Sequence, residues 1–373
     1  MVNMANILCE FYDVDLFLYY PQGTMRSRLS SKVHILSPNW RISVLAMSAE
    51  DVFGSKKVKY ILFKIVASVW AKCFGNQIPI AHAFRHQEKL TGYDLAIAYH
   101  HEQPRHSLAS GYTKFINTKV ESKKKAAWLH FDPSQLHLNI HYCMGDYQKM
   151  DKIFCVSKSL KEKAKEAYPL MAEKLDYCYN FLDTANIRAM SLAELPFAID
   201  DETFVCFSAC RLSKEKALVR AVHCLAPVLK TNPDVIWYIA GDGVEYDNIQ
   251  AAIMQNHVED QIQLIGHQDN PYSFMKRANL VMNLSFHEAA PMVFLESLLF
   301  GVPVFATETS SAEEFAEFGS MFHICPNHER GITQSFENLI NQKSSLREMK
   351  VSFDYDLNDE SLEKIKSLIC REA

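Results

Sequence analysis

The sequence contains no pair of cysteines spaced for a zinc site or a redox disulfide. Its ten cysteines are scattered without a CxxC, and several stand inside apolar runs such as KIFCVS and FVCFSAC. Such thiols fit buried, reduced side chains of a cytoplasmic protein better than a disulfide framework. The start, MVNMANILCEFYD, lacks the basic residues and long apolar core of a secretion signal, so we expect none.

Long apolar segments and positive charge are lacking as well. No uncharged run reaches the roughly 18 residues that a membrane-spanning helix needs. The formal net charge of −5 gives no overall attraction to nucleic acid, which we exclude as a partner. What is present is a chain of 373 residues, 48% hydrophobic and 22% charged, a globular composition long enough for two domains.

The second half of the chain alternates apolar runs with stretches of helical spacing. The runs that predict strands are residues 203–210, 234–243, 261–266, 280–285, 302–308 and 321–326. Helical spacing falls between them, in residues 217–233, 246–257, 272–279, 291–301 and 311–319. Continuous apolar strands separated by helices predict a parallel sheet covered on both faces. Ligands of such sheets bind beyond the carboxyl ends of the strands, so the following loops are the place to look for chemistry.

The first half repeats this pattern less regularly. Strands are predicted at residues 14–20, 32–38, 93–100, 125–132 and 151–157, and helices at 56–74 and 158–168. The sequence therefore predicts an α/β protein of two doubly wound, Rossmann-like domains that face a cleft. We place the domains at residues 1–182 and 201–373, with a linker at 183–200. The last helix is expected to pack back toward the N-terminal domain.

The stretch LSFHEAAPMVFLESLLFGVPV sets two glutamates around one predicted helix. Pro291 suits the first helical turn and Gly301 suits the end, so Glu288 precedes the helix and Glu296 lies inside it. The first N–H groups and the positive end of the helix dipole would form a site for a diphosphate. The N–H groups expected there belong to Ala290, Met292 and Val293.

Two carboxylates beside an anion site suggest a ligand with hydroxyls on both sides of its phosphates. Glu288 could accept hydrogen bonds from a sugar and Glu296 from a ribose, which is the pattern of a nucleotide sugar. The alternative is an ordinary helix with an acidic residue at its start and one solvated glutamate.

A second anion signal follows the strand at residues 203–210. The sequence RLSKEK there puts Arg211 and Lys216 at the carboxyl end of a strand, where they could neutralise a diphosphate. The alternative is a solvated charged loop, which we favour for Lys214 and Glu215. Because this loop and the Glu288 loop belong to one predicted sheet, we expect Arg211 and Lys216 to share a site with the glutamates.

At this point the residues resemble a family. ACRLSKEKA resembles the GRLxxEKG segment of GT-B glycosyltransferases of the family-4 type, also called glycosyl transferases group 1. HEAAPMVFLESLLFGVPV resembles their EGxPxxxxEAxxxGxPV segment. YIAGDG, IQLIGHQDN and ANLVMNLS occupy the intervening family positions in order. The resemblance covers roughly residues 90–320, and the combination is far more specific than any one motif.

The resemblance implies roles for individual residues. Arg211 and Lys216 would bind the donor diphosphate and Glu296 the ribose hydroxyls. The segment Gly266, His267 and Gln268 would lie near the base and contact it through the main chain. Catalytic roles fall to Glu288, beside the donor sugar, and to His130, which ends a predicted strand and matches a family histidine that contacts that sugar.

The resemblance also implies a reaction. It is that of a retaining glycosyltransferase of hexosyltransferase type, which moves a sugar from a UDP- or GDP-sugar to a glycan or lipid-linked acceptor. We expect no tightly bound cofactor and no essential metal, because cationic groups and a helix terminus stabilise the leaving diphosphate. The expected setting is cell-surface polysaccharide or glycolipid synthesis, in the cytoplasm or peripherally at the inner face of the membrane.

The sequence departs from the family pattern in several places. Three family glycines are replaced by Cys210, Ala217 and Ala289, changes that keep the backbone N–H groups and are harmless where φ stays negative. The opening residues resemble the family's first helix and second strand, without the usual first strand and Gly-rich loop. The alternative function is therefore a non-catalytic GT-B binding subunit that supports an active transferase.

Two further segments of the first half carry cationic or titratable side chains. Residues 56–74 could form a cationic helix that touches an anionic membrane together with Lys123–Lys125. We favour the alternative of a core helix with a solvated lysine face. His100, His101 and Glu102 end another predicted strand and could line the acceptor side. A metal site there is disfavoured, because adjacent histidines in a strand point to opposite faces.

Overall fold

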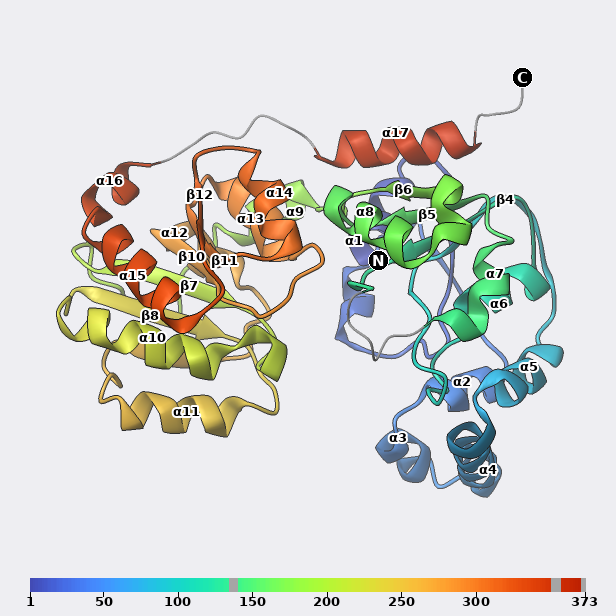
Figure 1. The fold of residues 1–373 in the computed structure, drawn as a ribbon. Coiled ribbons are helices and arrows are strands. Elements are labelled where there is room, and N and C mark those ends of the chain that lie inside the picture. Colours follow the sequence, from blue (N-terminus) through green and yellow to red (C-terminus); the bar gives the residue numbers. More distant parts are fainter. Residues whose placement is uncertain (134–139, 350–356, 370–373) are drawn as a thin grey trace. The chain divides into compact units, whose positions relative to one another are not determined.

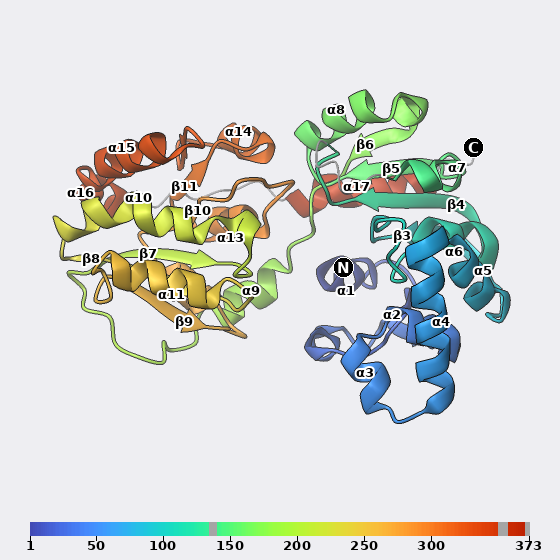
Figure 2. The same cartoon turned by 60° about the horizontal axis from the view of Figure 1, so that its bottom comes forward.

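The computed structural model describes residues 1–133, 140–349 and 357–369. The chain divides into two compact units, drawn in Figures 1 and 2. The first comprises Met1–Phe181 with Asp356–Ala373, and the second comprises Leu182–Tyr355. Each unit is a parallel α/β structure and is described by itself.

The second unit is built on a six-stranded sheet with the order β12-β11-β10-β7-β8-β9, and every pairing in it is parallel. Its strands are β7 (Phe204–Ala209), β8 (Val235–Ala240), β9 (Ile262–Gly266), β10 (Leu280–Asn283), β11 (Val304–Thr307) and β12 (Phe322–Cys325). All six strands predicted in this half are confirmed, and so is their arrangement as a parallel, doubly wound sheet.

Helices connect these strands as the apolar spacing predicts. They are α10 (Leu218–Lys230), α11 (Tyr246–Gln255), α12 (Tyr272–Arg277), α13 (Met292–Phe300) and α14 (Ser310–Ala316). Two further helices, α15 (Glu329–Ile340) and α16 (Lys343–Glu348), follow the last strand and were not predicted. A single 3-10 turn, η5 (Lys214–Lys216), precedes α10, and α9 (Thr184–Met190) occupies part of the expected linker.

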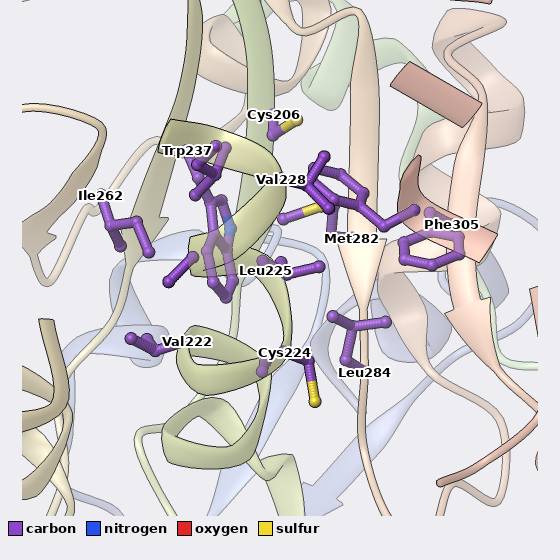
Figure 3. Close-up of a cluster of buried hydrophobic side chains, with 14 of the residues drawn as sticks. Cys206, Val222, Cys224, Leu225, Val228, Trp237, Ile262, Met282, Leu284 and Phe305 are labelled. Carbon is purple, nitrogen blue, oxygen red and sulfur yellow. The ribbon is translucent and has the colours of Figure 1, made fainter. Parts of the chain in front are cut away.

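The core of the second unit lies between α10 and the sheet, as Figure 3 shows. Val222, Leu225 and Val228 of α10 face Trp237 of β8 and Met282 of β10, and all five are at most 5% exposed. Burying a side chain such as Leu225 stabilises the fold by about 1.5–3 kcal/mol.

One polar link lies within this core. The indole Nε1 of Trp237 donates to Ser208 Oγ at 3.0 Å, and Ser208 Oγ donates to Met282 O at 2.8 Å. The link fixes β8, β7 and β10 side by side, because each buried polar group in it finds a partner.

The first unit contains two sheets, both parallel. The larger has the order β3-β4-β5-β6, formed by β3 (Leu90–Ala98), β4 (Val120–Leu129), β5 (Lys152–Cys155) and β6 (Leu175–Tyr177). The first two predicted strands are short, β1 (Asp15–Phe17) and β2 (His34–Leu36), and pair with each other in a separate sheet. This half is therefore less regular than a single doubly wound sheet.

Some helices of the first unit pack against the larger sheet, and others pack against one another. The helices are α1 (Val2–Leu8), α2 (Trp40–Ala46), α3 (Ala49–Gly54), α4 (Val58–Phe74), α5 (Gln77–Arg85), α6 (Tyr112–Lys119), α7 (Met144–Tyr147), α8 (Lys158–Ala167) and α17 (Leu357–Ile369), with 3-10 turns η1 (Thr24–Arg28), η3 (His141–Cys143) and η4 (Pro169–Lys174). The final helix α17 belongs to this unit. Ser361 Oγ donates to Tyr179 O at 3.1 Å, and Lys364 Nζ donates to Tyr177 O at 2.8 Å.

Helix α4 corrects one interpretation of the sequence. We favoured a core helix for residues 56–74, yet Val58 is 68% exposed, Val66 64% and Phe74 67%. The fully buried residues of α4 are the small Ala67 and Ala71. The preference for a core helix was wrong, because apolar residues lie on the outer face of α4 as well as on its packed face.

The cysteines are in keeping with reduced thiols. Nine of the ten are described, and all nine are free. Cys73 of α4 is exposed, whereas most of the others are buried. Cys370 lies outside the described residues.

Candidate functional site

The order of the strands in the second unit changes direction between β7 and β10. Strands β7, β8 and β9 follow one another toward one edge, whereas β10, β11 and β12 continue from the other side of β7. The loops after β7 and β10 therefore lie on either side of a topological switch point, which is where ligands of open parallel sheets bind. The first of these loops carries Arg211 and Lys216, and the second carries Glu288.

Lys216 and Glu288 meet at this switch point. The Nζ of Lys216 lies 2.5 Å from Oε1 of Glu288, and their side chains are 22% and 11% exposed. Glu288 Oε1 also accepts hydrogen bonds from Ser285 Oγ at 2.8 Å and from Asn283 Nδ2 at 3.2 Å. A charge-assisted pair with extra donors on its carboxylate holds both side chains in place.

The two loops are also joined through their backbones. The N–H of Phe286 donates to Glu215 O at 2.9 Å. Arg220 of α10 donates from Nη2 to Leu284 O at 2.9 Å, and its guanidinium lies 4.1 Å from the ring centroid of Phe286. Ser285, Asn283 and Arg220 were not predicted from the sequence. The polar residues directly after a buried strand are the signal that could have identified the first two.

The loop after β7 is shaped by the loop after β8. The N–H of Leu212 donates to Asp242 O at 2.9 Å, and the N–H of Glu245 donates to Leu212 O at 3.0 Å. Gly243 has φ +156°, and a Cβ placed there would lie 2.3 Å from Leu212 O. Only glycine allows this approach, so Gly243 positions the segment that carries Arg211. Gly241 and Gly243 belong to the YIAGDG motif, but this role of Gly243 was not predicted from the sequence.

Arg211 is exposed, and its charge affects the neighbouring carboxyl of Glu215. The pKa of Glu215 is lowered, chiefly by a backbone hydrogen bond and in smaller part by Arg211 and Lys216. Lys216 also lies near the Cys210 thiol, whose pKa burial raises to about 11. The loop thus presents two cations at the carboxyl end of β7.

The replaced family glycines behave differently from one another. Among the described non-glycine residues, positive φ occurs at Lys56, Ala217 and His257. Ala289 is not in this group, so its N–H is kept without strain. Ala217, the residue between η5 and α10, has φ 52° and ψ 28°. Its replacement is therefore not harmless, because a left-handed L-residue costs about 1–2 kcal/mol.

Helix α13 begins one residue later than predicted. Pro291 is the N-cap, in an extended conformation with φ −68° and ψ 128°, and its side chain does not cap the helix. The N–H groups of Met292 and Val293 belong to the first turn, where an α-helix has no intrahelical partners for them. The helix ends at Gly301, whose φ of 65° forms a left-handed C-cap. Ala290 lies in the loop just before Pro291.

Glu296 lies on α13 against α12. Its Oε1 accepts a hydrogen bond from Tyr272 Oη at 3.3 Å. Burial raises the pKa of this carboxyl from 4.5 to about 7, and the Tyr272 hydrogen bond opposes the rise. Glu296 is nevertheless partly exposed, so its carboxyl is neither fully solvated nor fully enclosed. Glu296 makes no direct hydrogen bond to Glu288 in the described part of the chain.

The segment after β9 lies at the same end of the sheet, on its edge strand. Gly266 O accepts from Gly241 N at 2.8 Å, and Gln268 Nε2 donates to Ile265 O at 2.7 Å. His267 is exposed, with Nε2 3.4 Å from Asp269 Oδ1. The main chain of this segment thus adjoins the Gly-rich loop after β8.

His130 belongs to the first unit and follows strand β4. Its Nε2 lies 2.9 Å from Tyr99 O. Because that carbonyl can only accept, Nε2 carries the proton and Nδ1 is left as an acceptor. The pKa of His130 is lowered to about 3, mainly by burial and to a smaller extent by the nearby His101. The ring is therefore neutral near pH 7.

Glu102 does not line an acceptor side, which corrects that expectation. It is 1% exposed. Its carboxylate accepts from Ser110 Oγ at 2.6 Å, from Thr113 Oγ1 at 2.7 Å and from Thr113 N at 2.8 Å. These contacts fix the start of α6, which is a structural role. No group of three potential metal ligands occurs among the residues that the structure describes.

Comparison with known proteins matches the second unit to a family. Residues 195–352 fit the family model described as glycosyl transferases group 1. N-acetyl-alpha-D-glucosaminyl L-malate synthase of Bacillus anthracis is 26% identical over 182 residues, 48% of this chain and 47% of that protein. The N-acetylgalactosamine-N,N'-diacetylbacillosaminyl-diphospho-undecaprenol 4-alpha-N-acetylgalactosaminyltransferase of Campylobacter jejuni is 28% identical over 198 residues, 52% of each chain. The matched part thus spans about half the length of these relatives.

Solved structures extend the likeness to the fold of both units. Anabaena Alr3699/HepE in complex with UDP-glucose superposes with a TM-score of 0.65 at 17% identity, covering 98% of this chain and 94% of that one. The α/β architecture is that of the GT-B glycosyltransferases, which confirms the predicted fold class. Within the described ranges, no helix combines the length and the apolar character that crossing a membrane requires.

Proposed function

We propose that this chain is a retaining glycosyltransferase that uses a nucleotide-sugar donor. The match of residues 195–352 to the glycosyl transferases group 1 model and the GT-B fold support this proposal. The sugar is a hexose type, and the acceptor is a glycan or a lipid-linked glycan. The observation that carries the proposal is the Lys216–Glu288 pair at the switch point between β7 and β10.

UDP is the proposed nucleotide of the donor. The Anabaena protein of like fold was solved with UDP-glucose, and a pneumococcal O-GlcNAc transferase of TM-score 0.50 was solved with UDP and GlcNAc. GDP remains the second choice from the sequence. The named relatives act on malate and on an undecaprenol-linked glycan, so they leave the class of acceptor open to test.

The cationic groups after β7 bind the diphosphate in this proposal. Lys216 and Arg211 would bind its oxygens, together with the first N–H groups of α13. A phosphate oxygen near Lys216 Nζ would share that ammonium with Glu288. The carboxylate could then accept from sugar hydroxyls while Ser285 and Asn283 keep it oriented. Positive groups arranged before the reaction stabilise the charge that develops on the leaving diphosphate.

The remaining site residues act on the two ends of the donor. Glu296 and Tyr272 would hold the ribose hydroxyls, and the main chain of 266–268 would lie along the base. His130 is proposed to accept a hydrogen bond from the donor sugar at Nδ1. The same positive groups would supply the charge that a metal supplies elsewhere, so we expect transfer to survive a chelator. We place the reaction in the cytoplasm, at a membrane or near one.

Calorimetric titration with UDP, GDP and ADP tests the donor site. The wild type should bind one nucleotide, and Glu296→Ala and Lys216→Ala should bind it more weakly. Lys214→Ala is the matched control, because Lys214 is an exposed lysine of the same loop for which we expect no role. Wild-type protein that binds none of the three nucleotides would contradict the proposal.

A second assay separates an enzyme from a binding subunit. Release of free hexose from the sugar of the bound nucleotide should be slow but measurable, and Glu288→Gln should abolish it. Nucleotide binding without any hydrolysis or transfer, across a panel of glycan and lipid-linked acceptors, would favour the non-catalytic subunit.

A further inference from the structure

Helix α4 carries an apolar stripe on its outer face, which we call the α4 stripe. It consists of Val58, Leu62, Ile65, Val66, Val69, Trp70 and Phe74, each at least 39% exposed. Most of these positions are three or four residues apart and two pairs are adjacent, so together they cover about half of the circumference of the helix. Exposed apolar residues scattered singly need no explanation, but a contiguous patch on a helix marks a surface for binding.

The opposite face of α4 is fixed, so the stripe cannot turn inward. Ala67 and Ala71 are buried in a cluster with residues of α2 and α5. The ammonium of Lys64 donates to Leu45 O at 2.9 Å and to Met47 O at 2.8 Å, at the end of α2. A helix that is apolar on all sides is normally buried. Here one side is packed and the other is open in the described structure.

Two helices packed against α4 also carry exposed apolar side chains. Phe53 of α3 is 56% exposed and Ile78 of α5 is 60% exposed. Both helices pack against α4, as the contacts and Figure 2 show.

Lysines border the stripe at both ends. Residues 56–74 contain five lysines and no acidic residue, in a chain of net charge −5. Lys56, Lys57 and Lys59 are exposed around the start of α4, and Lys72 is exposed in its last turn. Lys57 Nζ lies 5.0 Å from the ring centroid of Tyr60. Lys59 Nζ lies 5.3 Å from that of Trp40.

We propose that the α4 stripe lies in the surface of a lipid bilayer that contains anionic lipids. Apolar side chains would enter the boundary between headgroups and acyl chains, and the lysines would reach the lipid phosphates. At 17 residues with three lysines inside it, α4 is too short and too charged to span a bilayer, so it lies in the plane of the surface.

Charge decides between a bilayer and a second copy of the chain. Two α4 helices packed through their stripes would bring lysine-bordered surfaces together without an acidic residue of α4 to pair with them. An anionic bilayer supplies the opposite charge across the whole face. This surface belongs to the first unit and does not depend on the proposed donor site.

Sedimentation with vesicles tests the proposal. The protein is mixed with vesicles of phosphatidylcholine alone, or with about 30% phosphatidylglycerol. We expect binding to the anionic vesicles, which Leu62→Glu with Val69→Glu should weaken at least about tenfold. Lys56→Glu with Lys72→Glu should weaken it by about fivefold for each charge removed and remove the preference for phosphatidylglycerol.

Matched controls lie elsewhere on the surface. Leu170→Glu changes a leucine that is 78% exposed on η4. Lys230→Glu changes an exposed lysine in the last turn of α10, as Lys72 lies in the last turn of α4. Both controls should bind vesicles as the wild type does. Every variant should keep the thermal unfolding midpoint and, if the donor site is as proposed, the nucleotide affinity of the wild type.

Trp70 provides a direct readout of depth. It is 39% exposed, whereas Trp128 and Trp237 are each 1% exposed. Its emission should shift to the blue on anionic vesicles and be quenched by brominated acyl chains, and Trp70→Phe should remove both effects while binding persists. Wild-type protein that stays in the supernatant would overturn the proposal. So would vesicle binding that the α4 substitutions leave unchanged, or a concentration-dependent dimer, lost in Leu62→Glu with Val69→Glu, that does not bind vesicles.

Discussion

Lys216 and Glu288 lie 72 positions apart in the sequence, yet Lys216 Nζ approaches Glu288 Oε1 to 2.5 Å. Their loops follow β7 and β10, strands that are neighbours in the sheet at the point where its order reverses. A cation and an anion that pair at such a point can each bind one part of a ligand that carries both phosphate and hydroxyl groups.

Substitutions of Lys216 and of Glu288 are predicted to affect UDP binding differently. Lys216→Ala should weaken UDP binding by about 2 kcal/mol, or roughly 30-fold, because a charged hydrogen bond to phosphate is lost. Glu288→Gln should leave UDP affinity unchanged or severalfold tighter, because the carboxylate no longer competes for the ammonium. Calorimetry on both variants measures this. Equal weakening by the two substitutions would show that the pair acts only to hold the loops together.

The raised pKa of Glu296 predicts a change of stability with pH. The folded value of about 7 exceeds the ordinary 4.5, so folding favours the protonated acid. The contribution of Glu296 to stability is then greatest below pH 4.5 and is lost as pH rises through about 7; the loss is at most about 3 kcal/mol and is less here, because the side chain is partly exposed. Glu296→Gln should match the wild type near pH 5 and exceed its unfolding free energy at pH 8.

Urea unfolding at the two pH values measures this difference. Tyr272→Phe is a useful second variant, because the Tyr272 hydrogen bond lowers the pKa of Glu296 and its loss should raise that pKa further. A Glu296→Gln variant with the pH dependence of the wild type would show that another group causes the change. If Glu296→Gln also binds UDP more weakly than the wild type, Glu296 contributes to nucleotide binding although it lowers stability at neutral pH.

His257 provides a test of backbone strain that is independent of function. It is exposed and has φ 51° just after α11, where Val258 N donates to Ile253 O at 3.4 Å as in a Schellman turn. His257→Gly should stabilise the protein by about 0.5–1 kcal/mol, because the left-handed cost exceeds the entropy that glycine adds to the unfolded chain. Ala251→Gly, in the exposed interior of α11, should destabilise it by about 1 kcal/mol. Ala217→Gly should gain less than His257→Gly, since it also removes a buried methyl group.

His130 is predicted to be neutral across the physiological range. Its pKa of about 3 arises mainly from burial, and its Nε2 proton is held by Tyr99 O. The ring signals of His130 in nuclear magnetic resonance, assigned by their loss in His130→Gln, should not shift between pH 5 and 8. In urea-unfolded protein the same ring should titrate near 6.5. A folded-state titration near neutral pH would mean that the ring is solvated, and protonation of Nδ1 would then remove its proposed acceptor role below that pH.

The regular parts of this fold could be predicted because their signals are local. In the second half, each strand is a continuous apolar run and each helix has a marked end, such as Pro233 after α10 or Gly301 after α13. The first half was harder to predict, because β1 and β2 have three residues each and pair only with each other. The outer face of α4 was misjudged for a related reason, since apolar spacing cannot show which side of a helix is packed.

The candidate site shows the same division. The sequence alone determined which residue types stand after which strands, because strand, loop and helix follow from patterns within about ten residues. Only the tertiary structure decided that Lys216 meets Glu288, that Glu296 turns to Tyr272, that Glu102 caps α6 and that Gly243 supports the Arg211 loop. Those relationships depend on strand order and on which side chains lose water, and both are properties of the packed chain rather than of any one segment.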